Sequence, residues 1–189
     1  QFSDSHVVFP NYEKKETESG DIAIQLLTEG KVKKHLLKAL NGARKGDEIW
    51  IGMFYLAERD TVQALSKASK RGVEVRLILD PNQNAFGNEK IGLPNLPVAA
   101  ELMERGEGLI DIRWYKTDKE QYHSKLAMVE KEEESVIIGG STNFTRRNME
   151  DYNLETNLKI AASQDAKISK EVKLYFEKLW NNTGGNYTV

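Results

Sequence analysis

Residues 48–56 read EIWIGMFYL, an almost unbroken run of apolar and aromatic side chains with the length of a strand. Such a run is typical of a strand that is buried on both faces of a sheet, which requires a covering layer on each side. Upstream, residues 22–26 alternate apolar with polar or small side chains, as a half-buried strand does. The apolar positions of 31–46 then recur at helical spacing, and Gly46 stands where a C-terminal cap is expected.

The same alternation of elements continues downstream. A helix is predicted over about 60–71 and an alternating strand over 73–79, so that the chain begins β-α-β-α-β. This order favours parallel strands joined by right-handed helical crossovers. A long loop rich in Pro, Asn and Gly follows at 80–97. The remaining predicted elements are, in order, a helix at 99–105, strands at 110–115, 123–129, 135–138 and 152–160, and an amphipathic helix within 163–182.

The pattern as a whole predicts one α/β domain that spans residues 21–189. Its sheet is expected to be mixed but mostly parallel, with helices on both faces. Residues 1–20 are mainly polar and charged and are interpreted as a lead-in or linker.

The composition narrows the possible functions. The 189 residues carry 27 Lys+Arg and 29 Asp+Glu, a net charge of -2, so no global positive field draws the chain to nucleic acid or anionic lipid, although local patches stay open. The absence of Cys excludes disulfides, thiolate metal sites and a cysteine nucleophile. No window approaches the roughly 18 unbroken apolar residues of a membrane-spanning helix. We therefore expect a soluble domain, with its cellular compartment undetermined.

Groups suited to an anion are expected to gather at one end of two neighbouring strands. His123 and Lys125 are two residues apart on the predicted strand 123–129, so their side chains share a face. The following strand leads into the turn GGSTN (139–143), whose glycines let backbone N–H groups approach an anion closely. The turn ends at Asn143. A base, a cation, a hydroxyl and an amide together suit a phosphate oxyanion.

These residues resemble the H-x-K motif of the phospholipase D superfamily, in which the motif is followed by an acidic residue, a glycine or serine turn and Asn. The β-α-β-α-β order upstream and the segment NLETNL (153–158) downstream also lie where that family has them. One departure is visible, because Glu130 stands where the family usually has Asp, seven positions after His123. Its extra methylene suggests a structural rather than a chemical role.

The resemblance implies phosphodiester cleavage or phosphatidyl transfer through a phosphohistidine intermediate. A neutral imidazole, that of His123, is a competent nucleophile toward phosphorus, and a second, protonated imidazole would give the leaving oxygen its proton. Lys125 and Asn143 would bind the non-bridging oxygens. Glu155 would orient the imidazole, with Asp151 as the alternative. No metal or other cofactor is then required.

Three further residues are candidate substrate contacts. Gly140 would bring a backbone N–H group to the phosphate. Ser141 either caps the turn or places its hydroxyl beside the phosphate. Arg146 is solvated in the simplest interpretation, and in the other interpretation it contacts a headgroup or phosphate.

Active sites of this family need two such motifs, and this chain has one. Neither His6 nor His35 reproduces the pattern, because the residues that follow them do not match it. Two arrangements would supply the second histidine: a symmetric homodimer that shares one site, or a longer protein of which this chain is the C-terminal half. The start at Gln1 and the linker-like lead-in favour the longer protein.

The residues do not specify the substrate. The superfamily contains phospholipases, phosphatidyltransferases such as cardiolipin synthases, and nucleases. Because a nuclease normally carries a basic excess and this chain is slightly acidic, we expect a phospholipid, met at a membrane surface. The alternatives are a metal-independent endonuclease of the same superfamily and a catalytically silent scaffold that retains half of a site.

Overall fold

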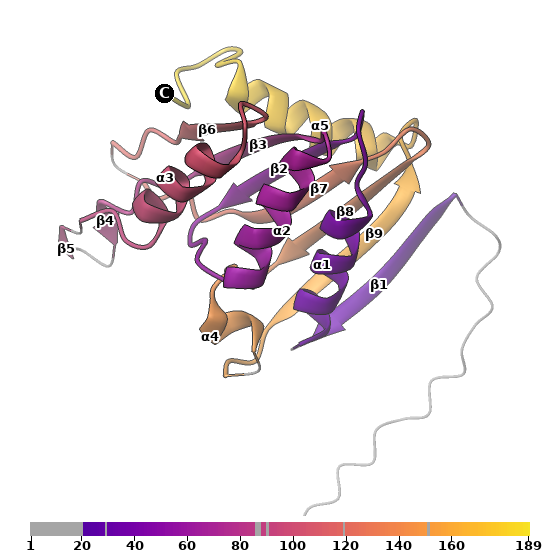
Figure 1. The fold of residues 1–189 in the computed structure, drawn as a ribbon, viewed down its shortest axis with the longest axis horizontal. Coiled ribbons are helices and arrows are strands. Elements are labelled where there is room, and N and C mark those ends of the chain that lie inside the picture. Colours follow the sequence, from indigo (N-terminus) through magenta and orange to yellow (C-terminus); the bar gives the residue numbers. More distant parts are fainter. Residues whose placement is uncertain (1–20, 29, 86–87, 90, 119, 151) are drawn as a thin grey trace, which may run out of the picture.

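The computed structural model describes residues 21–189 except 29, 86–87, 90, 119 and 151, so the predicted lead-in 1–20 lies outside the described residues. The described chain forms a seven-stranded sheet in the order β1-β9-β8-β7-β2-β3-β6 and a small separate hairpin of β4 and β5 (Figure 1). The strands are β1 (Ile22–Thr28), β2 (Glu48–Met53), β3 (Glu74–Leu79), β4 (Asn84–Ala85), β5 (Asn88–Glu89), β6 (Ile110–Trp114), β7 (Lys125–Glu130), β8 (Glu134–Gly140) and β9 (Thr156–Ser163). The helices are α1 (Lys31–Gly42), α2 (Arg59–Lys70), α3 (Asn95–Arg105), α4 (Arg146–Met149) and α5 (Lys167–Trp180).

The strand directions divide the sheet into two parts. β2, β3 and β6 are parallel, and α2 and α3 are the crossovers between them. The sequence predicted the crossover through α2, whereas β1, expected in the same parallel run, lies at the far edge of the sheet and pairs with β9. The other four neighbouring pairs, β1–β9, β9–β8, β8–β7 and β7–β2, are antiparallel. The mixed α/β class is therefore confirmed, but the expectation of a mostly parallel sheet is wrong. For β7 and β8 the reason is chain length, because their short connection closes a hairpin and leaves no room for a helical crossover.

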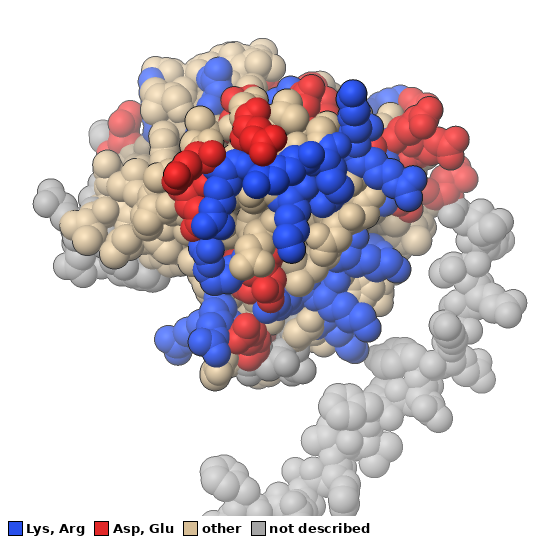
Figure 2. All heavy atoms as spheres, in the orientation of Figure 1, with Lys and Arg blue, Asp and Glu red and all other residues tan. Residues whose placement is uncertain are grey.

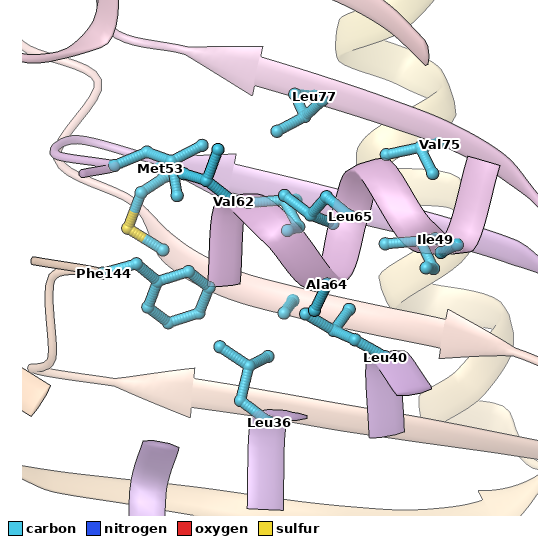
Figure 3. Packing of buried hydrophobic residues seen from close by; sticks show 14 of the residues in the cluster. Leu36, Leu40, Ile49, Met53, Val62, Ala64, Leu65, Val75, Leu77 and Phe144 are labelled. Carbon is cyan, nitrogen blue, oxygen red and sulfur yellow. The ribbon is translucent and has the colours of Figure 1, made fainter. Parts of the chain in front are cut away.

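The central strand β2 is buried on both faces, as its apolar run predicted. Ile49, Ile51 and Met53 face α1, α2 and α3 and belong to the larger core cluster, part of which Figure 3 shows. Trp50 points to the opposite face, where its ring stacks on Phe176 of α5 with the ring centroids 5.6 Å apart. Helices thus cover both faces of the sheet. The apolar side of α5 that packs there is the predicted one and consists of Ile168, Val172, Phe176, Leu179 and Trp180.

The ends of several elements differ from the prediction. Helix α1 ends at Gly42, and Gly46 instead takes a positive φ of 93° in the turn that leads into β2. Strand β9 begins at Thr156, four residues later than predicted, because the segment before it turns around α4. No described helix is long and apolar enough to cross a membrane.

Candidate active site

The predicted site residues lie at one end of the sheet because of the strand register. Lys125, the first residue of β7, pairs with Met53, the last residue of β2. On the other side of β7, Leu126 pairs with Gly139 near the end of β8, and Gly140 pairs with Asn157 at the start of β9. The chain therefore brings the segments that carry His123, Ser141 and Glu155 to the same edge.

The structure places the side chains of His123 and Lys125 together. His123 lies just before β7 and is exposed, whereas Lys125 is 8% exposed. The Nζ atom of Lys125 lies 3.3 Å from both ring nitrogens of His123 and 3.1 Å from its carbonyl oxygen. Phe54 packs against both residues, with its ring centroid 4.7 Å from that of His123 and 5.3 Å from Lys125 Nζ. An imidazole and an ammonium group are thus held side by side over an apolar ring.

This environment sets the protonation states of the pair. Partial burial of the ring and the positive charge of Lys125 lower the pKa of His123 below its usual value of 6.5, against the opposing effect of Asp80. Burial also lowers the pKa of Lys125, against the attraction of Glu155. A His123 ring that is neutral near pH 7 keeps a free lone pair, which is the form that a nucleophile requires.

Glu155, which the resemblance gives the role of orienting the imidazole, is buried, and its hydrogen bonds go to residues other than His123. Its carboxylate accepts a hydrogen bond from the hydroxyl of Ser141 and another, of 2.6 Å, from the side-chain amide of Asn148. Glu155 makes no hydrogen bond to His123 in the described structure, and its effect on the pair is the electrostatic one on Lys125. Asp151, the alternative for this role, lies outside the described residues.

The hydroxyl of Ser141 makes hydrogen bonds to the first residue of β9 and to the residue before it. Besides donating to Glu155, its Oγ accepts the backbone N–H of Thr156 at 3.0 Å. Gly140 has a packing reason for being glycine, because an added Cβ would lie 2.3 Å from the carbonyl oxygen of Thr156. The turn is therefore anchored to β9, whatever its backbone N–H groups bind.

Asn143 lies in the loop after this turn and is half-buried. Its Oδ1 is buried and has no hydrogen-bond partner within the part of the chain that the structure describes. No hydrogen bond joins it to His123 or Lys125 in that part. A buried amide left unpaired is costly unless a ligand satisfies it, so Asn143 is available to a bound group.

Arg146 is exposed on the short helix α4 and pairs with Glu150 at 2.8 Å. Together with Arg147 and Tyr152 it lines a shallow surface hollow. Because this ion pair lies at the protein surface, Arg146 can exchange it for a phosphate at little cost.

Asp80 is a residue that the sequence analysis missed. It follows β3, is 1% exposed, and accepts the backbone N–H groups of Asn82 and Tyr122, each at 2.7 Å. Burial raises the pKa of Asp80, and its hydrogen bonds to Asn82 and Tyr122 oppose this effect. Asp80 thus fixes the backbone next to His123 and is the carboxylate whose charge acts on that imidazole. Its position at the carboxyl end of a buried parallel strand was the available signal.

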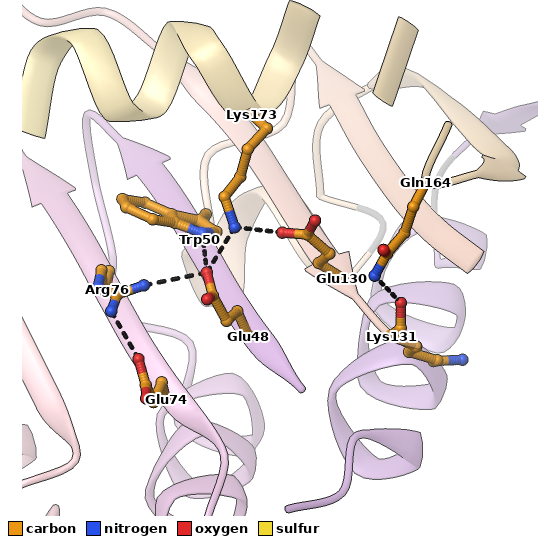
Figure 4. Close-up of polar contacts among 8 residues, drawn as sticks. All are labelled: Glu48, Trp50, Glu74, Arg76, Glu130, Lys131, Gln164 and Lys173. Atoms are coloured by element: carbon orange, nitrogen blue, oxygen red, sulfur yellow. Dashed lines mark hydrogen bonds and ion pairs between the residues drawn. The ribbon is translucent and has the colours of Figure 1, made fainter. Parts of the chain in front are cut away.

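Glu130, the departure from the family pattern, lies far from this edge. It ends β7, and its carboxylate pairs with Lys173 of α5, which also binds Glu48 at 2.6 Å (Figure 4). Although burial lowers it, these carboxylates raise the pKa of Lys173 overall. Glu130 therefore holds α5 against the sheet at the end opposite His123.

The described residues contain no group of three or more His, Cys, Asp or Glu side chains that could hold a metal ion. The groups available to a substrate at this edge are thus an imidazole, an ammonium and amides.

Comparison with known proteins identifies the family of most of the domain. The family model described as cardiolipin synthase, PLD-like domain, matches residues 36–180. No curated protein sequence matches the chain.

Solved structures share the fold at low sequence identity. Nuc from Salmonella typhimurium, a phospholipase D family member, is 20% identical with a TM-score of 0.64, and the match covers 85% of this chain and 95% of that one. NucT from Helicobacter pylori is 18% identical with a TM-score of 0.62, over 85% of this chain and 96% of that one. The phosphatidylserine synthase of Haemophilus influenzae Rd KW20 is 16% identical with a TM-score of 0.66, over 89% of this chain but only 40% of that one. Because the family model spans more than half of the residues, this chain belongs to the cardiolipin synthase-type PLD-like domains of the phospholipase D superfamily.

Proposed function

We propose that this chain cleaves or transfers phosphodiesters through a covalent intermediate on His123, and that its substrate is a phospholipid. The observation that carries the proposal is the position of Lys125 Nζ, 3.3 Å from both ring nitrogens of His123. A cation at this point stabilises a phosphoryl group bound to either nitrogen and keeps the free imidazole neutral.

The reaction would proceed in two displacements. A ring nitrogen of His123 attacks phosphorus, the bond from phosphorus to the leaving alcohol breaks, and a protonated imidazole of a second motif gives that oxygen its proton. The same imidazole then takes a proton from water or from an acceptor alcohol, whose oxygen attacks phosphorus and breaks the P–N bond. Lys125 and the unpaired amide of Asn143 would bind the non-bridging oxygens in both steps.

We propose a supporting role for Glu155 from the contacts that it makes. Since it binds Ser141 and Asn148, it holds the loop that carries Asn143 and attracts the Lys125 ammonium. Gly140 and Arg146 remain candidate contacts of the phosphate and headgroup.

The second motif would come from a second copy or from another segment of a longer protein. The matched structures include Nuc, which is covered over 95% of its length, and the longer phosphatidylserine synthase, which is covered over only 40%. A partner is supported by exposed apolar side chains on the face of β1 and β9 that α5 leaves uncovered, among them Ile24 at 65% and Leu26 at 60% exposure. Sedimentation beside a phosphodiesterase assay tests this, because a fully active monomer contradicts both arrangements.

The substrate class is tested by assaying a labelled phospholipid beside DNA in a gel. The slightly acidic chain and the match to a cardiolipin synthase-type model favour lipid turnover. Turnover of DNA without turnover of lipid would assign the endonuclease activity instead. The His123→Asn variant is the control, because any activity that survives in it belongs to another protein or another site.

A further inference from the structure

Helix α1 presents a one-sided stripe of positive charge to solvent. Lys31, Lys34 and Lys38 follow each other at helical spacing and are all exposed. The helix, KVKKHLLKALNG, contains no acidic residue. The neighbouring helix α2 adds Lys67 and Lys70, which are also exposed.

Strand β9 extends this stripe beside α1. Lys159 pairs with Ile138 of β8, whose side chain lies in the core cluster beneath α1, so Lys159 points to the same side of the sheet. The positive charges of this surface act together on His35 of α1. Burial and the charges of Lys159, Lys34, Lys38 and Lys31 lower the pKa of its imidazole. We call the six lysines of this surface the helical basic face: Lys31, Lys34, Lys38, Lys67, Lys70 and Lys159.

The lysines of the helical basic face have no ion-pair partner among the described residues, although the charge of Lys67, after that of Lys33, lowers the pKa of Asp60. Lys33, on the inner side of α1, is the contrast, because it pairs with Glu58, Asp60 and Glu150 at 2.8–3.2 Å. Figure 2 shows many Lys and Arg side chains over α1 and α2, with acidic side chains both among them and at the right-hand margin of this view. Charge left unpaired in this way marks a surface for an anionic partner.

The inner side of α1 also connects this face to the catalytic edge. Lys33 pairs with Glu58, whose backbone N–H donates to the carbonyl oxygen of Phe144 at 2.8 Å. Phe144 follows Asn143 directly in the chain. The first turn of α1, where Lys31 and Lys34 stand, is therefore linked through Lys33 and Glu58 to the loop that carries Asn143.

We propose that the helical basic face docks the chain on an anionic phospholipid bilayer. Two features favour a bilayer over nucleic acid. The six residues are all lysines, which act as point charges toward phosphates. None of them is an arginine, whose planar guanidinium could make two hydrogen bonds to the edge of a base. Helices α1 and α2 also contain no Phe, Tyr or Trp on which bases could stack. This inference rests on the proposed function, because docking on a bilayer serves the chain only if its substrate is a phospholipid.

The expected size of the effect follows from the number of charges. Each Lys near an anionic bilayer strengthens binding about fivefold, so removing two should weaken it roughly thirtyfold. The interaction should also weaken as salt rises, because the Debye length falls to about 8 Å at physiological ionic strength.

Vesicle sedimentation with the full 189-residue chain tests the proposal. The probes are vesicles of phosphatidylcholine alone and of phosphatidylcholine mixed with phosphatidylglycerol. The test variant is Lys34→Gln with Lys38→Gln, and the matched control is Lys167→Gln with Lys170→Gln, which removes the same charge from exposed positions of α5. Binding of a DNA duplex is measured in parallel.

We expect binding to the anionic vesicles only, a roughly thirtyfold loss in the α1 variant, and little change in the α5 control. Equal losses in both variants, or no binding to anionic vesicles, would overturn the proposal. The proposal would also be overturned if the α1 variant kept its vesicle binding but lost its binding to DNA. The His123→Asn variant should bind vesicles as the unmodified chain does, so docking can be measured even if the proposed activity fails. Conversely, phospholipid turnover by a chain whose vesicle binding does not depend on the helical basic face would refute the docking proposal and leave the proposed function standing.

Discussion

Replacing Asp80 with Asn should weaken the support beneath His123 in two measurable ways. The buried carboxylate of Asp80 accepts backbone N–H groups from Asn82 and Tyr122, both at 2.7 Å. An amide keeps one acceptor oxygen and turns its NH₂ group toward one of these donors. Loss of one hydrogen bond to a charged acceptor should lower the free energy of unfolding by about 2–3 kcal/mol. For a chain of this size, that corresponds to a fall in melting temperature of about 4–12 °C.

The same substitution should shift the titration of His123. The charge of Asp80 favours the imidazolium, so its removal should lower the pKa of His123 further. Both effects can be followed, by calorimetry and by NMR titration of the imidazole protons. Asp111→Asn, at an exposed position on β6, is the matched control and should change the stability by less than about 0.5 kcal/mol. An Asp80→Asn variant with the melting temperature and the His123 pKa of the unmodified chain would refute the assigned role.

Three further outcomes follow from the site and its scaffold. Lys125→Met should raise the pKa of His123 in an NMR titration, because a neighbouring cation is removed, and an unchanged pKa would contradict the electrostatic coupling of the two residues. The same substitution should slow turnover by on the order of 10²- to 10³-fold. Turnover by the competent assembly should persist in excess chelator, and its loss with recovery on adding Mg²⁺, Ca²⁺ or Zn²⁺ would contradict the mechanism. Lys173→Met should lower the free energy of unfolding by about 2 kcal/mol, because Glu48 and Glu130 then face each other without a cation, whereas an unchanged melting curve would deny the ion pairs a structural role.

The local elements could be predicted because their patterns depend on near neighbours in the chain. The apolar run at 48–56 became the doubly buried strand β2, and the apolar side of α5 packs where its spacing predicted. The sequence also predicted that His123 and Lys125 lie close together, although it placed both on a strand and β7 begins only at Lys125.

Strand direction and the partners of Glu155 depend on contacts that are distant in the sequence. The short connection after β7 already required a hairpin, a signal that outweighs the general preference of alternating elements for parallel strands. The bond between Ser141 and Glu155 exists because β8 and β9 are adjacent, and the sequence pattern does not specify which strands are neighbours. Asp80 was missed for the same reason, since it acts through the backbone of Tyr122, 42 residues away.

The central claim is that His123 forms a covalent bond to phosphorus, and an activated substrate tests it most directly. A nitrophenyl phosphodiester has a leaving group that needs no proton, so the first displacement should run even without a second imidazole. Rapid acid-free quenching and peptide mass spectrometry should then find a phosphoryl adduct on the peptide that contains His123, with nitrophenolate released in matching amount and no adduct in the His123→Asn variant. Release of nitrophenolate without an adduct, or an adduct that persists in the His123→Asn variant, would contradict the account.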